Sequence, residues 1–199
     1  MQDPCYFPMV MDIREKAFLL VGGGVIACEK FSRIREWTNN ISIVALEISD
    51  SMQKMADESS VKIEHRAFAM SDLDSIDIVI VAVNDLGLQR DIFYEATRRK
   101  ILCNAVDLAE YCHFIFPSVI RKGDLIVAIS TSGASPAFAK YLRRFFEKLI
   151  PLDIGNFLAV MRDKRATMPK GKDRMQFLDI EAQSYMKQMA EYAKKTLNT

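Results

Sequence analysis

AFLLVGGGVIACEK, from Ala17 to Lys30, joins an apolar run to three consecutive glycines and then to a segment of helical character. A strand that turns sharply into a helix presents the free N–H groups and the positive dipole end of that helix to a phosphate. Gly22 permits the turn, and Gly24, after Gly23, lets the backbone approach the phosphates. Ala27 stands at the third small position, where a methyl group still allows close packing of helix on strand. The stretch therefore predicts a dinucleotide site.

A second apolar run supports this prediction. Ile41 to Leu46 (ISIVAL) is rich in β-branched residues, and Glu47 follows it 20 residues after Ala27. A carboxylate there can accept hydrogen bonds from the hydroxyls of the adenosine ribose, which favours NAD over NADP. A glycine-rich turn without a ligand is the alternative, because a single motif of this kind is weak evidence. The strand, the helix and Glu47 together favour the nucleotide.

The composition is typical of a folded chain without a membrane segment. Half of the 199 residues are hydrophobic, enough for the core of one α/β domain and a smaller appendage. The opening MQDPCYFPMVMD has neither a basic nor an apolar region of the secretory kind, and no run approaches about 20 apolar residues. The four cysteines show no C-x-x-C spacing, and His65 and His113 stand apart. We therefore expect a cytoplasmic protein with reduced thiols and without a metal site.

The net charge of +1 conceals two halves of opposite sign. Residues 1–119 carry 12 Lys and Arg against 18 Asp and Glu, whereas residues 120–199 carry 15 against 8. The basic half suggests a second, anionic ligand, because Lys and Arg attract and orient carboxylates and phosphates. A solvated basic surface is the plain alternative. Nucleic acid fits less well, since the basic residues alternate with acids and lack interleaved aromatic residues.

Strand and helix patterns alternate along the first hundred residues. Strand-like runs lie at 17–21, 41–46, 61–65 and 78–83, and helix-like stretches lie at 25–37, 51–58 and 88–100. This βαβ alternation predicts a parallel sheet. The strands are nearly continuous apolar runs, as expected where helices cover both faces of the sheet.

The rhythm changes after Lys100. A short fifth strand is expected in ILCNAVD, and FIFPSVI and DLIVAIS flank Arg121-Lys122-Gly123 as two strands joined by a tight turn. Ser135-Pro136 then opens a helix that runs to Pro151. Its apolar residues recur on one face, which predicts a packed or dimer-forming helix. Residues 152–199 are helical and rich in methionine, with a break at Pro169 and Gly171.

Polar residues follow the predicted strands at the edge of the sheet where open α/β folds bind their ligands. Asn84-Asp85 follows the fourth strand and Asp107 the fifth. A carboxylate at this place can serve as a general base, although a helix cap or a salt bridge would also explain it. The hydroxyls and N–H groups of Ser130 to Ser135 (STSGAS) can form an anion-binding concavity, or simply a well-capped turn.

Three segments, YFPMVMDIREKAFLLVGGGVIACEK, VAVNDLGLQRDIFYEA and CNAVDLAEYCHFIFPSVIRKGDLIVAISTSGASPAFAKYLRR, together resemble the precorrin-2 dehydrogenase / sirohydrochlorin ferrochelatase family in order and spacing. The resemblance spans roughly residues 6–150. Its most specific part is NAVD…FIFPSVIRKGDLIVAISTSGASP, and the tail after Pro151 matches only in its helical character.

The resemblance implies a homodimeric enzyme of siroheme synthesis that oxidises precorrin-2 to sirohydrochlorin with NAD⁺. Some members then insert Fe²⁺, and Co²⁺ is the other metal to consider. The family's essential aspartate in its N-x-x-D motif falls on Asp107, which would take or relay a proton. The tetrapyrrole, with eight carboxylates, would bind between the NAD domain and the rest of the chain, in agreement with the basic charge after residue 120.

The sequence motifs and the resemblance together assign binding residues, and the resemblance itself covers Val25, Ile26, Leu46, Glu47 and Thr131. Those expected to contact the nucleotide are Gly22, Gly23, Gly24, Val25, Ile26, Leu46, Glu47, Val83, Asn84 and Asp85. Those expected to contact the substrate are Ser130, Thr131, Ser132, Gly133 and Ser135, with Thr131 where some members carry serine. Glu29, Leu46, Val83 and Ser132 depart from the usual arginine, proline, threonine and glycine.

The predicted organisation is a Rossmann-like NAD-binding domain at 1–111, a small α+β dimerisation and substrate region at 112–150, and a helical domain at 151–199. No methyltransferase domain is expected, so another enzyme would supply precorrin-2. Two rival hypotheses remain: a sensor that binds NAD and a tetrapyrrole without catalysis, and another NAD-dependent dehydrogenase acting on a small anion. The block from Asn104 to Pro136 argues against the second rival.

Overall fold

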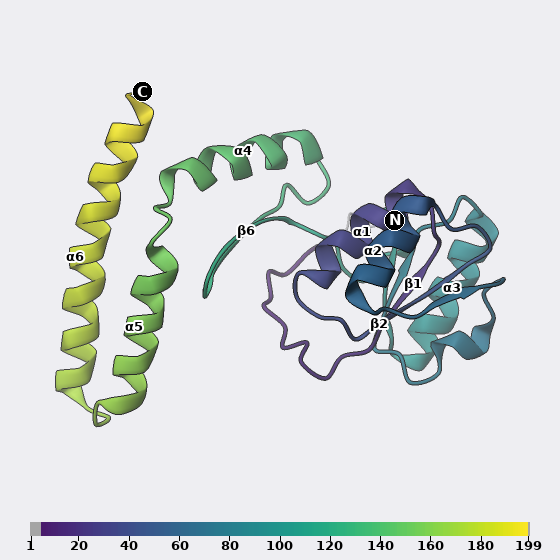
Figure 1. The fold of residues 1–199 in the computed structure, drawn as a ribbon, viewed down its shortest axis with the longest axis horizontal. Helices are drawn as coiled ribbons and strands as arrows, with labels where there is room; N and C mark the ends of the chain where they lie inside the picture. The colour runs from purple at the N-terminus through teal and green to yellow at the C-terminus, as the bar shows by residue number, and fades with distance from the viewer. Residues whose placement is uncertain (1–4, 199) are drawn as a thin grey trace. The chain divides into compact units, whose positions relative to one another are not determined.

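A computed structural model describes residues 5–198, and the chain divides into two compact units between Ile115 and Phe116 (Figure 1). The boundary lies four residues after the predicted one at 111. Both predicted C-terminal parts fall largely into the second unit, so their separation at residue 150 stays a prediction. Within the described residues, no helix is both long enough and apolar enough to cross a membrane.

The first unit is built on a five-stranded parallel sheet, with its first strand at the centre. The strands are β1 (Phe18–Val21), β2 (Ile41–Ala45), β3 (Ile63–His65), β4 (Ile78–Val81) and β5 (Leu102–Ala105), in the order β3-β2-β1-β4-β5. The order reverses direction between β1 and β4, which is the switch point at which doubly wound sheets bind ligands. The predicted Rossmann-like sheet is thus confirmed.

Helices cover both faces of this sheet. They are α1 (Val25–Arg35), α2 (Asp50–Ser59) and α3 (Leu86–Arg99), with short 3₁₀ turns η1 (Met70–Leu73) and η2 (Ala109–Tyr111). Leu19 and Val79 belong to one buried cluster with Ile92 of α3. Because side chains alternate along a strand, Leu20 and Ile80 face the opposite side, where α1 and α2 lie. The β1, β2, β4 and β5 strands read as apolar runs because their two faces are covered.

The second unit combines a hairpin with three helices. Its elements are β6 (Ser118–Lys122), β7 (Leu125–Ile129), α4 (Pro136–Leu149), α5 (Ile154–Thr167) and α6 (Lys172–Leu197). The predicted break between the last two helices is confirmed, and α5 and α6 lie side by side (Figure 1). Ser135 caps α4 by accepting a hydrogen bond from the Phe138 N–H, with Pro136 at the first helical position, as predicted.

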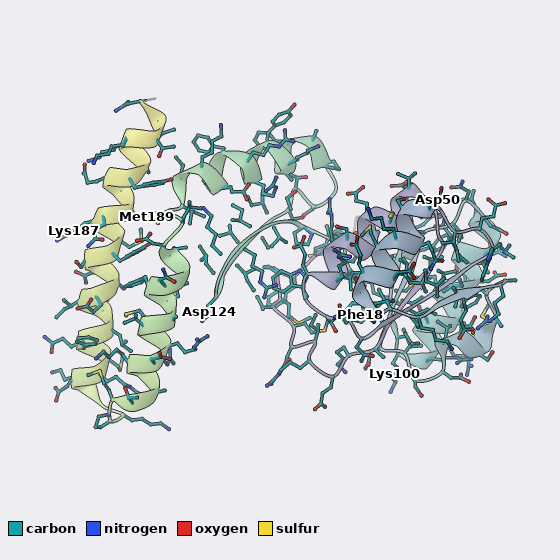
Figure 2. All side chains as sticks on the ribbon, in the orientation of Figure 1. Phe18, Asp50, Lys100, Asp124, Lys187 and Met189 are labelled. Carbon is teal, nitrogen blue, oxygen red and sulfur yellow. The ribbon has the colours of Figure 1, made fainter. Side chains whose placement is uncertain are left out.

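The hairpin turn differs from the prediction. Arg121 and Lys122 pair with Ile126 and Leu125 as part of the ladder, so the turn is not at 121–123 but at Gly123-Asp124. Gly123 has φ +59°, a conformation that glycine adopts at no steric cost. The chain therefore turns at this residue. Asp124 lies at the tip of the hairpin (Figure 2).

Three interactions tie the hairpin and helices of the second unit together. The Lys122 ammonium donates hydrogen bonds to the carbonyls of Glu147 (3.1 Å) and Ile150 (2.5 Å) at the end of α4, where the helix dipole favours a cation. A Cβ added at Gly123 would lie 2.8 Å from the Gly155 Cα, so the turn packs directly on the start of α5. The aromatic ring of Tyr185 in α6 stacks on that of Phe157 in α5, with centroids 4.1 Å apart.

Candidate functional site

The glycine turn after β1 is held in place by its two neighbouring strands. Gly22 has φ +122°, and a Cβ added there would lie 2.2 Å from the Ala82 carbonyl oxygen after β4. A Cβ added at Gly23 would lie 2.3 Å from the Glu47 carbonyl oxygen after β2. A Cβ at Gly24, in contrast, would meet nothing within 4 Å. The first two glycines are required by packing, and the third faces open space.

The start of α1 offers an uncapped helix end. Gly24 is the N-cap and provides no side-chain hydrogen bond, and the first turn contains no acidic residue. The N–H groups of Val25, Ile26 and Ala27 have no acceptor within the helix, because the first turn of a helix leaves these donors unpaired. The Val25 and Ile26 side chains are 82% and 43% exposed. Free donors, a positive dipole end and open space at Gly24 fit a phosphate.

The segment after β2 lies against one flank of the glycine turn. Leu46 and Glu47 are exposed, and the Ser49 N–H donates a 3.0 Å hydrogen bond to the Gly23 carbonyl. The Nε2 atom of His65 lies 2.5 Å from the Leu46 carbonyl oxygen and anchors the same segment. Glu47 thus has the position expected of the acid that follows the second strand.

The segment after β4 lies against the other flank. Val83 is half-buried, and Asn84 and Asp85 are exposed. The Asp85 carboxylate accepts a 2.9 Å hydrogen bond from the Leu88 N–H and caps α3, so its structural role is clear. Because Asp85 is the cap, α3 begins at Leu86 and not at Leu88 as predicted.

Gln89 is a residue of this segment that the sequence reasoning missed. Its side chain is buried, and its Nε2 donates a 2.6 Å hydrogen bond to the Val83 carbonyl. The available signal was its spacing: Gln89 precedes Ile92 and Ala96 on the buried face of α3, where an amide among apolar residues needs a polar partner.

Asp107 occupies a strained turn directly after β5. The Leu108 N–H donates a 3.3 Å hydrogen bond to the Ala105 carbonyl, which makes 105–108 a turn with Asp107 at its third position. Asp107 is exposed and has φ +66°, a conformation that a turn of this kind normally reserves for glycine or asparagine. The Val106 N–H donates to the Val81 carbonyl at 2.9 Å, so the turn is tied to the end of β4.

Two polar side chains support this turn, the buried Asn104 and the half-buried Cys112. Asn104 is 6% exposed, and its Nδ2 donates a 2.8 Å hydrogen bond to the Phe114 carbonyl. The Cys112 thiol lies within hydrogen-bond distance of the carbonyls of Ala105 (3.1 Å) and Leu108 (3.3 Å). In the N-x-x-D motif, therefore, the asparagine fixes the segment at Phe114 through a hydrogen bond, and the aspartate is exposed to solvent.

The electrostatics connect this turn with α1. Burial lowers the pKa of Lys30 in α1, and the charge of Arg33 adds to that effect, while the charge of Asp107 opposes it. Burial raises the pKa of the Cys112 thiol, and it raises the pKa of Cys103 to about 12. Both thiols are therefore protonated at neutral pH, which suits packing and weak donation and not nucleophilic catalysis.

His113 has a structural role. Its Nδ1 accepts a 3.0 Å hydrogen bond from the Cys103 N–H, its Nε2 lies 3.0 Å from the Thr97 hydroxyl, and its ring stacks on Phe93. Burial lowers the pKa of His113 and favours this neutral form. Among residues 5–198, no three His, Cys, Asp or Glu side chains gather to hold a metal ion.

A small cavity of about 190 Å³ lies between the start of α3 and the segment that follows the Asp107 turn. It is lined by Leu86, Gly87, Arg90, Leu108, Glu110 and Tyr111. The segments that follow β4 and β5 are therefore separated by this cavity and do not pack tightly against each other there.

The serine-rich loop belongs to the second unit. The hydroxyls of Ser130, Thr131 and Ser135 accept hydrogen bonds from the N–H groups of Ser132, Ser135 and Phe138, at 3.0, 3.0 and 3.2 Å. Ser132 and Gly133 both have positive φ. The loop's own hydroxyls thus occupy N–H groups that an anion would need. Each of these hydroxyls still has an O–H proton to donate, because a hydroxyl combines one donor with two acceptor positions.

Taken together, the structure brings the glycine turn, Glu47, the Val83–Asp85 segment and Asp107 to the carboxyl edge of one sheet. The glycine turn and the Val83–Asp85 segment follow β1 and β4 at the switch point, where a doubly wound fold binds a dinucleotide, and Glu47 and Asp107 follow the strands on either side, β2 and β5. The site has the parts expected of a dinucleotide site, a glycine turn at a helix start and an acid after the second strand, and an exposed carboxylate lies at the same edge of the sheet.

Comparison with known proteins assigns the chain to a family. Residues 9–118 match the family described as "Putative NAD(P)-binding", and residues 122–149 match "Sirohaem biosynthesis protein central". The chain belongs to this NAD(P)-binding family, which confirms the predicted class of cofactor.

Named relatives make the likeness more specific. The chain is 36% identical over 155 residues to "Siroheme synthase 1" of Serratia proteamaculans (strain 568), covering 78% of this chain and 33% of the relative. It is 32% identical over 162 residues to "Siroheme synthase" of Nitrosococcus oceani, covering 80% and 35%. The chain thus spans about a third of the length of these curated relatives.

One solved structure matches over almost the whole chain. It is "SirC, precorrin-2 dehydrogenase", with a TM-score of 0.74 and 19% sequence identity, covering 98% of this chain and 100% of the other. This match confirms the predicted fold class, including the small antiparallel sheet and the C-terminal helices.

Proposed function

We propose that this protein oxidises precorrin-2 to sirohydrochlorin with NAD⁺ as the electron acceptor. The named relatives support the substrate, and the family match supports the cofactor. The reaction removes a hydride and a proton from the substrate, and it produces NADH. The nicotinamide, when bound, supplies the hydride acceptor. The protein's own residues must hold the two reactants and accept the proton.

The observation that carries the proposal is the exposed carboxylate of Asp107 at the sheet edge that also holds the glycine turn. The positive φ of Asp107 is energetically unfavourable for this residue, and the surrounding hydrogen bonds hold the backbone in that conformation. Backbone strain of this kind is common at functional sites. An exposed carboxylate is suited to taking a proton from the substrate as the hydride leaves. General-base assistance of this type contributes about 10²- to 10⁴-fold to a rate.

The residues present fit the dinucleotide. The N–H groups at the start of α1 would bind the pyrophosphate, and Gly24 leaves the space for its approach. Glu47 would accept hydrogen bonds from the adenosine ribose, which favours NAD over NADP because its charge repels a 2′-phosphate. The Val83, Asn84 and Asp85 segment would face the other half of the dinucleotide.

The charge of the second unit supports an acidic substrate. Residues 120–199 carry a net charge of +7, and precorrin-2 bears eight carboxylates. The O–H groups of Ser130, Thr131 and Ser135 would donate to a carboxylate, while Ser132 and Gly133 shape the loop. Long-range attraction of this kind raises the encounter rate and weakens as salt is added.

The test is an anaerobic assay of precorrin-2 with NAD⁺ or NADP⁺, followed by absorbance, with wild-type protein and Asp107→Asn. We expect sirohydrochlorin to form faster with NAD⁺, and turnover to fall by about 10² or more in the variant while NAD⁺ still binds. An undiminished rate in Asp107→Asn would show that the role given to this carboxylate is wrong. Binding of both ligands without turnover by the wild type would identify a sensor instead. Turnover of a different small anion would identify another dehydrogenase.

Insertion of Fe²⁺ or Co²⁺ into sirohydrochlorin is a second candidate activity, favoured by the same exposed carboxylate, which can accept the pyrrole protons released. Adding either metal ion to the completed oxidation tests it, since metallation changes the spectrum of the macrocycle.

A homodimer is the proposed assembly, supported by aromatic residues of α4 that are exposed in the chain alone: Phe138 (57%), Tyr141 (65%) and Phe145 (46%). A cytoplasmic location is proposed because all four cysteines are free thiols.

A further inference from the structure

Gln89 carries a buried oxygen atom without a partner. The side chain is 4% exposed, and its Nε2 donates a 2.6 Å hydrogen bond to the Val83 carbonyl. Its Oε1 is buried and has no hydrogen-bond partner among residues 5–198. A carbonyl oxygen can be satisfied only by a donor, so the amide must present its nitrogen to Val83. The orphaned atom is therefore the oxygen, which needs an N–H or O–H group.

An orphaned buried acceptor is unusual in a folded protein, because most buried polar atoms are paired and an unpaired one costs stability. The position of Gln89 indicates where a donor for this oxygen could come from. Gln89 holds the Val83–Asp85 segment, and a Cβ added at Gly22 would lie 3.5 Å from the Val83 side chain. The unpaired oxygen thus belongs to the same loop system that flanks the glycine turn.

The strand order shows which half of a dinucleotide this loop would meet. β2 and β4 lie on opposite sides of β1. Glu47 follows β2 and would hold the adenosine ribose, whereas Val83 and Gln89 follow β4. A dinucleotide bound across the switch point, with its pyrophosphate on the glycine turn, therefore places its nicotinamide nucleoside on the β4 side.

We propose that Gln89 is a nucleotide-binding residue with two functions. Its Nε2 positions the Val83 carbonyl, and its Oε1 accepts a hydrogen bond from the nicotinamide nucleoside, donated by the carboxamide N–H or by a ribose hydroxyl. This inference rests on the nucleotide half of the proposed function and is independent of the identity of the second substrate.

The experiment measures dissociation constants of NAD⁺, ADP-ribose and ADP by calorimetry, for wild-type protein and Gln89→Met. Methionine has nearly the same length and shape but neither donates nor accepts strongly at these positions. We expect NAD⁺ binding to weaken by about tenfold and ADP binding to change less than about twofold, because ADP lacks the nicotinamide nucleoside. If ADP-ribose weakens as NAD⁺ does, the donor is a ribose hydroxyl. If ADP-ribose is unaffected, the donor is the carboxamide.

Two results would overturn the inference: unchanged NAD⁺ binding in Gln89→Met, or an equal loss for NAD⁺ and ADP, which would indicate general damage to the fold. Gln183→Met, at an exposed glutamine of α6, is the matched control and should bind all three ligands as the wild type does. Should Gln89→Met fail to fold, Gln89→Asn keeps the amide but withdraws it by one methylene group, and the same contrast is expected to a smaller degree. These measurements contain no tetrapyrrole, so a failure of precorrin-2 oxidation would leave the contrast intact.

Discussion

Cys112 lies directly under the turn that presents Asp107, with its sulfur atom 3.1 and 3.3 Å from the carbonyl oxygens of Ala105 and Leu108 on either side. Burial keeps the thiol protonated by raising its pKa, so its single S–H can donate to one or the other of these carbonyls. The strained conformation of Asp107 is thus maintained in part by a residue that follows it by five positions.

Replacing Cys112 with alanine should loosen this turn. A weak donor and a half-buried sulfur are lost, which should lower the free energy of unfolding by about 1 kcal/mol. Turnover of precorrin-2 should fall while the dissociation constant of NAD⁺ stays unchanged, because the glycine turn is not altered. Cys5→Ala, at an exposed cysteine, is the control for loss of a thiol. Equal kinetics for the two variants would contradict a positioning role for Cys112.

Two substitutions distinguish the effect of the Asp107 backbone conformation on stability from the effect of its carboxylate on turnover. Asp107→Gly removes the steric cost of φ +66° and should raise the free energy of unfolding by about 1 kcal/mol. Asp107→Asn keeps the side-chain shape at a position where asparagine is tolerated. Both should lose turnover, so a protein that is more stable and less active is expected from Asp107→Gly. Thermal denaturation and the precorrin-2 assay measure the two effects, and a loss of stability in Asp107→Gly would refute the strain argument.

The glycines should respond differently to alanine. Gly22→Ala places a methyl group 2.2 Å from the Ala82 carbonyl oxygen at an unfavourable φ, and should destabilise the first unit by roughly 2–4 kcal/mol. Gly24→Ala meets open space and should leave the melting temperature nearly unchanged. It should nevertheless weaken NAD⁺ binding, because the methyl group occupies the side from which the phosphates approach. Calorimetric binding together with thermal melting distinguishes the two, and unimpaired NAD⁺ binding by Gly24→Ala would count against the proposed phosphate position.

Stability should depend on pH through His113. Its pKa is lowered in the folded protein, mainly by burial, so the unfolded chain binds a proton more readily. The stabilising contribution of the neutral ring is fully present above the unfolded pKa of about 6.5 and is lost as the pH falls below it. His113→Gln should show a smaller fall in melting temperature between pH 7.5 and pH 5 than the wild type, as measured by circular dichroism. Identical slopes for His113→Gln and the wild type would exclude His113 as the source.

The second unit should depend on the contact between α5 and α6. The Tyr185 hydroxyl donates a 2.9 Å hydrogen bond to the Asp153 carboxylate, and burial together with this bond raises the pKa of Tyr185 to about 12. Tyr185→Phe keeps the ring stacked on Phe157 and removes only the hydroxyl, so it should cost about 1 kcal/mol. Tyr192→Phe, at a more exposed tyrosine of α6, is the control. Chemical denaturation of both variants measures the difference, which would vanish if the bond to Asp153 contributed nothing.

The sequence predicted the fold well because its strongest signals are local. The apolar runs around Leu19 and Val79 required a sheet buried on both faces, and Gly22 to Gly24 marked the turn into α1. Serine and proline at 135 and 136 located the start of α4 for the same reason, since capping depends on neighbours in the chain.

The features that were missed depend on contacts between distant segments. The hairpin turn was predicted at Arg121-Lys122-Gly123, between two apolar runs, whereas the strand register and the φ of Gly123 place it at Gly123-Asp124. Gln89 gave no motif, and its importance appears only when the Val83 carbonyl lies beside it. The serine loop illustrates the same limit, because composition cannot show that its N–H groups are satisfied by its own hydroxyls.

The positive φ at Asp107 has an evolutionary consequence. A descendant released from the need for this carboxylate would gain stability from glycine at the same position, so drift would replace the acid quickly. The amino acid found there in any homologue should therefore act as a record of whether selection for the chemistry is still in force.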